Sequence, residues 1–179
     1  KDPSPLRLGR GAQTEVEERL RAARTNVLHA LSHGARQVVV VTSAGPREGA
    51  STTAAGLARV LALSGHRVVL VGGDLRSPSA VGAPGAPGLA EVLVGTARLS
   101  QVLVEGEVPG LELLPAGDMP GNPSELLGGR NMSDLLHHLA ADRIVIIDAP
   151  PVCRFTDAVV LAEYAGGVLL VARAGRTSA

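Results

Sequence analysis

Residues 37–58 form an aliphatic run, a glycine-bearing turn and an alanine-rich stretch: Gln37-Val38-Val39-Val40-Val41-Thr42, Ser43-Ala44-Gly45-Pro46-Arg47-Glu48-Gly49-Ala50-Ser51-Thr52-Thr53 and Ala54-Ala55-Gly56-Leu57-Ala58. The β-branched run predicts a buried strand, and the alanine-rich stretch predicts a helix. The amides at the start of such a helix attract anions, and glycine lets the backbone approach them closely. This layout of strand, glycine turn, Ser-Thr and helix is typical of a loop that holds the phosphates of a nucleotide.

The loop departs from the usual phosphate-binding pattern at one central position. A lysine normally stands between the last glycine and the serine, where it reaches the β- and γ-phosphates, but this chain has Ala50. From the loop alone, an ordinary glycine turn into a helix remains an open alternative. The Ser51 hydroxyl is a candidate Mg²⁺ ligand. The residues that we expect to contact a nucleotide are Gly45, Arg47, Glu48, Gly49, Ala50, Ser51 and Thr52.

The composition fits one domain with an aliphatic core. The chain has 179 residues, 45% of them hydrophobic, which is enough to bury a sizeable core. Phe155 and Tyr164 are its only aromatic residues, so aliphatic side chains must fill that core, as in a parallel sheet covered on both faces. The 17 basic and 17 acidic residues balance, so we expect no nucleic-acid partner. The single Cys153 excludes an internal disulfide and fits a reducing compartment.

Strand-like and helix-like segments alternate along the chain, which predicts an α/β fold with a doubly wound, mostly parallel sheet and helices on both faces. Ligands of such sheets bind beyond the carboxyl ends of the strands. Residues 1–13 are expected to be a lead-in or linker and residues 14–179 a single domain, whose first helix starts at a capping box formed by Thr14 and Glu17. The strands are expected at Gln37–Thr42, Arg67–Val71, Leu111–Pro115, Arg143–Ile147 and Gly167–Ala172. The helices are expected at Thr14 to about Ser32, Ser51–Ser64, roughly Gly88–Val104 with a break near Gly95, Pro123–Ala140 and Thr156–Tyr164.

Two aspartates come directly after aliphatic runs. Asp74 follows Val68-Val69-Leu70-Val71-Gly72-Gly73, and Asp148 follows Ile144-Val145-Ile146-Ile147. A carboxylate at a strand end faces the ligand crevice and can hold Mg²⁺ or a water bound to it, so Ser51, Asp74 and Asp148 are the predicted metal ligands. Each aspartate alone could equally cap a turn. The three motifs in this order, each at a strand end, favour a nucleotide site.

Together these motifs resemble the bacterial tyrosine kinases of capsule and exopolysaccharide synthesis, which belong to the phosphate-loop ATPases with a deviant loop, the MinD/ParA-like group. The likeness covers nearly the whole chain. It implies Mg-ATP or Mg-ADP as the ligand and Asp74 and Asp148 as catalytic residues. The matching segments are Val39–Ser43 with Glu48-Gly49 and Ser51–Ala55, then Asp74-Leu75-Arg76-Ser77-Pro78, Asp148-Ala149-Pro150-Pro151, Leu114–Gly117, Asn122–Leu127 and Thr156-Asp157-Ala158.

Three residues differ from the family pattern. Ala50 replaces the loop lysine, Arg47 replaces a glycine, and Gly72 replaces the first aspartate, which the resemblance assigns to activation of the tyrosine hydroxyl. Because phosphoryl transfer depends on positioning and charge neutralisation, we predict impaired catalysis and weak or lost nucleotide binding. Because Arg47 and Gly72 differ from the family pattern as well as Ala50, natural degeneration is favoured over a single engineered change at position 50.

Two alternatives remain open. In the first, the Arg47 guanidinium takes over the role of the lysine and the chain is an active ATP-dependent tyrosine kinase. In the second, it is a nucleotide-binding switch ATPase of the same superfamily. Partition-type ATPases of that superfamily carry a further lysine where this chain has Gly45, which disfavours the second alternative.

The resemblance also implies assembly at a membrane. Glu18, Arg21 and Arg24 match the Glu-x-x-Arg-x-x-Arg motif through which these kinases associate into rings, although a solvated salt-bridged face is the alternative. We therefore expect a ring-type homo-oligomer in the cytoplasm, fused to or docked on a transmembrane polysaccharide co-polymerase. The family fold continues past Gly175-Arg176-Thr177, so we expect its C-terminal part to be missing from this chain.

Overall fold

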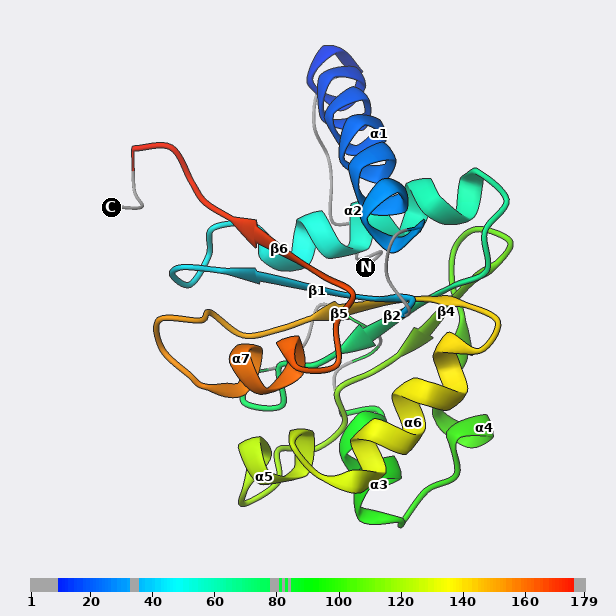
Figure 1. Ribbon diagram of the computed structural model, residues 1–179, viewed down its shortest axis with the longest axis vertical. Helices are drawn as coiled ribbons and strands as arrows, with labels where there is room; N and C mark the ends of the chain where they lie inside the picture. The colour runs from blue at the N-terminus through cyan, green and yellow to red at the C-terminus, as the bar shows by residue number, and fades with distance from the viewer. Residues whose placement is uncertain (1–9, 33–35, 78–80, 82, 84, 176–179) are drawn as a thin grey trace.

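A computed structural model describes residues 10–32, 36–77, 81, 83 and 85–175, with the backbone alone for residues 10–17. Within these ranges six strands form one sheet in the order β3-β4-β2-β5-β1-β6 (Figure 1). All neighbouring strands are parallel except β3, which runs antiparallel to β4. The strands are β1 (Val38–Ser43), β2 (Val68–Gly72), β3 (Val104–Glu105), β4 (Leu111–Leu114), β5 (Ile144–Asp148) and β6 (Gly167–Val171). The mostly parallel, doubly wound α/β prediction is therefore confirmed.

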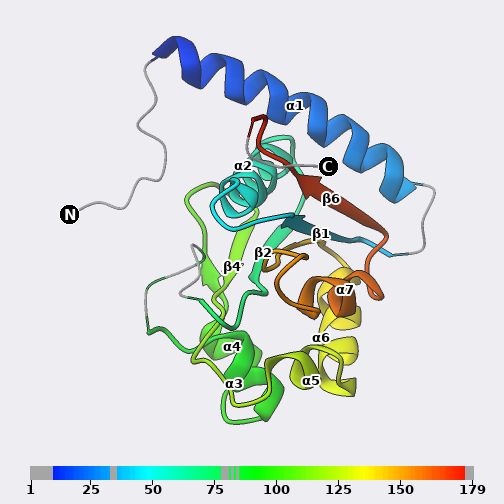
Figure 2. The same cartoon turned by 90° about the vertical axis from the view of Figure 1, so that its left-hand side faces the viewer.

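Helices cover both faces of the sheet, as Figures 1 and 2 show. On one face lie α1 (Arg10–Ser32) and α2 (Ala50–Leu63). On the other lie α3 (Leu89–Val94), α4 (Leu99–Val102), α5 (Pro123–Leu127), α6 (Arg130–Ala140) and α7 (Asp157–Ala162). Among the described residues, no helix is both long and apolar enough to span a membrane.

The aliphatic strands divide their side chains between two cores. Val38 and Val40 of β1 pack toward α3, α5, α6 and α7, whereas Val39 and Val41 pack toward α1 and α2. Strands β2 and β5 alternate in the same way. Since successive side chains of a strand point to opposite faces, a sheet covered on both sides requires apolar residues at every position. This explains the continuous runs in the sequence.

Several element boundaries differ from the expectations. Helix α1 begins at Arg10, so the predicted capping box at Thr14 is wrong, and only residues 1–9 of the expected lead-in lie outside the described residues. The segment expected as one helix from Pro123 to Ala140 is two helices, because Gly128 and Gly129 form a turn between them. The break near Gly95 is confirmed, where Gly95 has φ +86°. Strand β3 was not expected, since it is two exposed residues long.

The start of α3 docks closely on the loop that follows β4. The amide of Leu89 donates to the Pro115 carbonyl at 2.7 Å, and the Glu91 carboxylate accepts the Gly88 amide at 2.6 Å. A Cβ atom added to Gly88 would lie 2.1 Å from the Pro115 carbonyl oxygen. Position 88 therefore has no room for a side chain, and the obstacle is backbone that cannot rotate away.

We predict that Gly88→Ala destabilises the protein by about 3 kcal/mol, because overpacking against fixed backbone must displace the loop. Urea unfolding followed by circular dichroism measures the change. Gly121→Ala is the matched control, because a Cβ there meets no atom within 4 Å. Equal stability of the two variants would contradict this close approach of α3 to the loop.

Candidate functional site

The loop between β1 and α2 has the backbone of a phosphate cradle. Gly49 adopts the left-handed conformation with φ +101° immediately before α2, and the Thr53 amide donates to its carbonyl at 2.9 Å. The Ser43 hydroxyl donates to the Gly45 carbonyl at 2.8 Å, which closes the turn at the strand end. Ser51 and the exposed Thr52 lie in the first turn of α2. The amides of this first turn have no acceptor within the helix and can bind an anion.

The ends of β1, β2 and β5 are joined at the same edge of the sheet. Gly72 of β2 pairs in register with Asp148 of β5, and β5 pairs with β1. All three motifs found in the sequence therefore meet at this edge. Three main-chain hydrogen bonds fix it: Ala149 N–H to Val41 O at 2.9 Å, Val152 N–H to Ser43 O at 2.9 Å and Gly73 N–H to Asp148 O at 2.8 Å.

Asp148 and Ser51 are in contact at this edge of the sheet. The side chain of Asp148 is 3% exposed and shares a hydrogen bond with the Ser51 hydroxyl. Burial raises the pKa of Asp148 to about 6, the Ser51 hydrogen bond lowers it, and the nearby charge of Asp74 raises it again. Burial likewise raises the pKa of Asp74, although its carboxylate accepts the Arg76 amide at 3.0 Å. A cation bound by Asp148 and Asp74 would offset the cost of burying these carboxylates and the effect of the Asp74 charge on Asp148.

The donor set fits magnesium. One hydroxyl and two carboxylates are hard oxygen ligands, of the kind Mg²⁺ takes together with waters and phosphate oxygens. In the described part of the chain, no cluster of three or more His, Cys, Asp or Glu side chains could hold a metal ion. The candidate site therefore depends on Ser51 as the third protein donor, beside Asp74 and Asp148.

The three departures from the family pattern lie in or beside the cradle. Ala50 is the first residue of α2, and its methyl group is buried in the core beneath α1 and α2. Arg47 is exposed on the loop and has a positive φ of 61°, a conformation that glycine adopts more easily. Glu48 folds back so that its Oε1 would lie 3.1 Å from a Cβ on Gly45. The loop thus has the shape of a phosphate cradle without an amine at position 50. The neighbouring end of β2 has no carboxylate at position 72.

One cluster beside the site was not predicted. The Arg76 guanidinium pairs with Asp157 at the start of α7, 81 residues away, and also donates to Ser124 of α5. The sequence contained a signal, since all three residues lie in segments that resemble family signatures. The pairing itself follows only from the fold.

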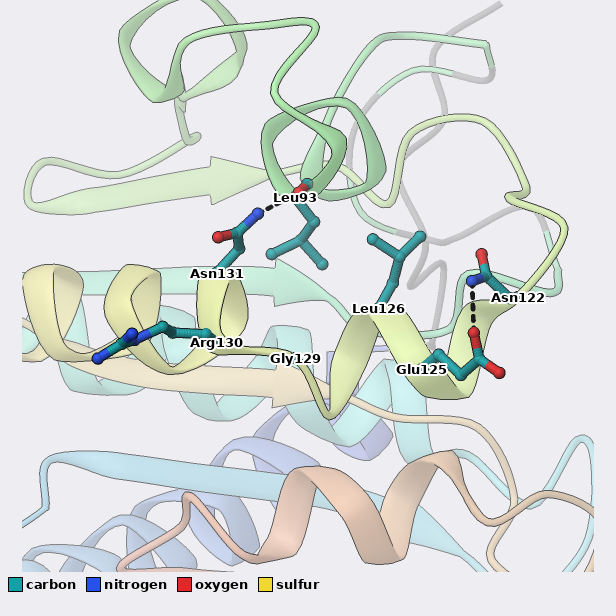
Figure 3. Close-up of a pocket in the computed structure, with 7 residues that line it drawn as sticks. All are labelled: Leu93, Asn122, Glu125, Leu126, Gly129, Arg130 and Asn131. Atoms are coloured by element: carbon teal, nitrogen blue, oxygen red, sulfur yellow. Dashed lines mark hydrogen bonds between the residues drawn. The ribbon is translucent and has the colours of Figure 1, made fainter.

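The described residues line two pockets in the part of the molecule that contains Arg76 and Ser124. One, of about 240 Å³, lies between α3 and the α5–α6 junction and contains none of the predicted site residues (Figure 3). There Asn131 donates to the Leu93 carbonyl and Asn122 to the Glu125 carboxylate. The other, of about 310 Å³, is bounded by Leu75, Arg76 and Ser77 after β2 and by residues 115–119 after β4. Of these two pockets, the second includes the residues that directly follow Asp74.

The predicted association motif lies on α1. Glu18 and Arg21 are exposed, with Arg21 Nη1 3.9 Å from Glu18 Oε2, and Arg24 lies one turn further on. Such an exposed pair contributes little to stability. The motif is therefore available for contacts with another molecule, and its role as an interface stays a prediction.

The chain is similar to known tyrosine-protein kinases. It is 38% identical to tyrosine-protein kinase YwqD of Bacillus subtilis, over 89% of this chain and 69% of YwqD. It is 36% identical to tyrosine-protein kinase ptk of Acinetobacter johnsonii over 89% of its length, which is only 22% of ptk. The kinase domain of Escherichia coli tyrosine kinase ETK superposes with a TM-score of 0.82 at 32% identity, covering 90% of this chain and 65% of that domain. No family model matches the chain.

The chain belongs to the bacterial tyrosine-protein kinase family. It spans about a fifth of the length of the longer relatives, such as ptk. The cell division ATPase MinD of Pyrococcus furiosus, 22% identical with a TM-score of 0.63 over 75% of this chain and 58% of MinD, has the same fold. The predicted fold, including its likeness to the fold of MinD, is thus confirmed.

We predict that Asp148→Asn stabilises the protein at pH 7 by roughly 2–3 kcal/mol. The pKa of Asp148 is raised from 3.8 to about 6 on folding, so the folded state binds the proton more tightly than the unfolded state does. Its ionisation therefore lowers stability as pH rises from 3.8 through 6. The gain should disappear below pH 4, as urea unfolding at both pH values would show. If Asp148→Asn and the unmodified protein were equally stable at pH 7, the desolvated environment of Asp148 would be contradicted.

Proposed function

We propose that this chain is the cytoplasmic kinase-like domain of a polysaccharide co-polymerase and tyrosine autokinase system that controls capsule or exopolysaccharide synthesis. In this proposal it transfers little or no phosphate and acts through regulated oligomerisation. One observation supports it most: the phosphate loop keeps its left-handed glycine at position 49 and its serine–aspartate contact, but positions 50 and 72 have lost their charged side chains.

The two losses remove separate contributions to phosphoryl transfer. A lysine in the loop offsets the negative charge that develops on the β- and γ-phosphate oxygens, and such a contact contributes a few kcal/mol. A general base that accepts the tyrosine proton contributes roughly 10²–10⁴-fold in rate. Without Lys at 50 and Asp at 72, both contributions are lost, and the expected rate approaches background.

The remaining residues are suited to holding magnesium. Ser51, Asp74 and Asp148 would bind it, and the bound ion supplies charge neutralisation for a phosphate group. With Ala50 in place of the lysine, the protein provides no amine beside the phosphates. We therefore propose that any Mg-ATP or Mg-ADP binding is weak.

Arg47 supports the alternative of an active kinase. Its guanidinium is exposed on the loop itself and can bind phosphate oxygens in a bidentate manner. Its backbone has φ +61°, which makes this an unfavourable position for any residue with a side chain. Arginine at 47 leaves the absence of a carboxylate at position 72 uncompensated, so we favour the impaired form. A nucleotide-dependent switch without kinase activity is the further alternative.

The proposal of partners rests on two observations. Some relatives are much longer than this chain, and α1 carries the predicted association motif. Because the chain spans about a fifth of ptk, we propose that it works with a membrane-spanning polysaccharide co-polymerase, fused or separate, at the inner face of the cell membrane. The exposed Glu18 and Arg21 and the half-buried Arg24 would join copies of the domain into a ring.

We predict that the unmodified protein binds Mg-ADP and Mg-ATP at least about tenfold more weakly than a variant carrying Ala50→Lys and Gly72→Asp, because a hydrogen bond to a charged group contributes roughly 1.5–3 kcal/mol. Isothermal titration calorimetry measures both affinities. The control combines Leu63→Lys with Val94→Asp, which adds the same two charges at exposed positions in α2 and α3, away from the loop.

Tight binding by the unmodified protein would contradict the loss of nucleotide binding and favour the switch. Equal, weak binding by the unmodified protein and the double variant would mean that the loop is not a nucleotide site. Improved binding by the control variant would mean that the added charges act from any position, and would contradict a specific role for positions 50 and 72.

We predict that Glu18→Ala, Arg21→Ala and Arg24→Ala together prevent self-association, because they remove the charged groups of the proposed interface. Sedimentation velocity at increasing protein concentration measures the assembly. The control combines Glu105→Ala, Arg98→Ala and Arg130→Ala, an equal change in charge at exposed positions outside α1. Identical association of the α1 variant and the unmodified protein would exclude this interface.

A further inference from the structure

The side chain of Arg76 connects three segments that are distant in sequence. Its Nε donates to Asp157 Oδ2 at 2.6 Å and its Nη2 to Asp157 Oδ1 at 3.1 Å. Nη2 also donates to the Ser124 hydroxyl oxygen at 3.0 Å, and that hydroxyl donates to Asp157. The guanidinium carbon lies 4.7 Å from the centre of the Phe155 ring. Bidentate pairing and stacking on a ring together fix the guanidinium plane.

The acceptor of this ion pair is deeply buried. Asp157 is 0% exposed and is the first residue of α7, whereas Arg76 keeps 29% of its side chain exposed. A buried carboxylate is costly unless it is paired and hydrogen-bonded. Arg76 and Ser124 together satisfy both of its oxygen atoms. The turn after β2 is thereby attached to α7, and to α5 through Ser124.

The main chain of the same arginine holds a predicted magnesium ligand. The Arg76 amide donates to Asp74 Oδ1 at 3.0 Å. The Ser77 amide also donates to the Asp74 carboxylate. Asp74 therefore takes part of its orientation from Arg76, whose side chain is anchored 81 positions along the chain. Helix α7 follows the loop that begins at Asp148. The Arg76–Asp157 ion pair therefore connects the turn that contains Asp74 to the segment that follows Asp148.

We infer that Arg76 is a positioning residue: its ion pair with Asp157 and its bond to Ser124 hold the turn of residues 74–77 so that the Asp74 carboxylate is fixed at the strand edge beside Asp148. The benefit of this position to a bound magnesium ion rests on the proposed function, but the positioning itself does not. The competing explanation is that the short-range bond from Arg76 to Asp74 is self-supporting, as in ordinary aspartate turns.

Hydrogen exchange of single amides, measured by NMR, separates the two explanations. The test variant combines Arg76→Met with Asp157→Asn, because removing the arginine alone would leave a buried unpaired carboxylate. The control combines Arg143→Met with Glu112→Gln, a half-buried ion pair that joins the first part of β4 to the residue before β5. The reference amides are those of Gly166 and Val68, which are bonded to the Val38 and Gly110 carbonyls.

In the test variant, the main-chain amide of residue 76 should exchange at least about tenfold faster, after correction for the intrinsic rates of arginine and methionine, while the reference amides are unchanged. Only the anchored turn then opens. The control pair should leave the Arg76 amide unchanged. Unchanged protection of that amide in the test variant would overturn the inference, since the turn would then support itself. Uniformly faster exchange at all amides would also overturn it, since the pair would then contribute only to global stability.

A second measurement connects the turn to magnesium. In a protein that already carries Ala50→Lys and Gly72→Asp, the Arg76→Met and Asp157→Asn changes should reduce the gain in ADP affinity that Mg²⁺ provides by about tenfold, with ADP affinity in EDTA unchanged. An unchanged magnesium gain would overturn the functional part of the inference. Failure of that protein to bind ADP at all would count against the proposed function, while the exchange result still decides the positioning role of Arg76.

Discussion

The structure depends on the parallel alignment of β1, β5 and β2, whose carboxyl ends are fixed side by side by main-chain hydrogen bonds. The Ala149 amide binds the Val41 carbonyl, and the Gly73 amide binds the Asp148 carbonyl. These bonds place the start of α2, the Asp148 carboxylate and the turn at Asp74 at one edge, independently of any charged side chain there. An aliphatic sheet with two covered faces maintains this alignment. The scaffold therefore does not depend on a lysine at position 50 or an aspartate at position 72.

The proposed impairment concerns the charged groups at this edge of the sheet. The charge of Asp74 raises the pKa of Asp148, and burial raises the pKa of both carboxyl groups. With Ala50 buried in the α1–α2 core, the protein supplies no lysine to offset these carboxylates. Arg76 does not supply the missing cation, because its guanidinium is engaged by Asp157. The edge retains acceptors for a cation but has lost the donor for a phosphate, which is the basis of the proposed impairment.

The fold could be read from the sequence because its dominant signal is local. Continuous aliphatic runs identified the five longer strands to within about a residue, and Asp74 and Asp148 followed from their places after those runs. The start of α1 at Arg10, the turn at Gly128–Gly129 and the short β3 were missed, since end positions depend on packing and weak local preferences. The Arg76–Asp157–Ser124 cluster could not be derived, because it arises only when residues 33 to 81 positions apart meet in the folded chain.

Phosphoryl transfer to tyrosine by the unmodified protein decides whether the domain is catalytically impaired. The protein would be incubated with Mg²⁺, γ-labelled ATP and a tyrosine-containing copolymer, and the label on tyrosine quantified against the Asp148→Asn variant. The account predicts no transfer above that variant, because neither a lysine at position 50 nor an aspartate at position 72 is present. Transfer that requires Asp148 and disappears on Arg47→Gly would contradict the account and establish Arg47 as the replacement for the lysine.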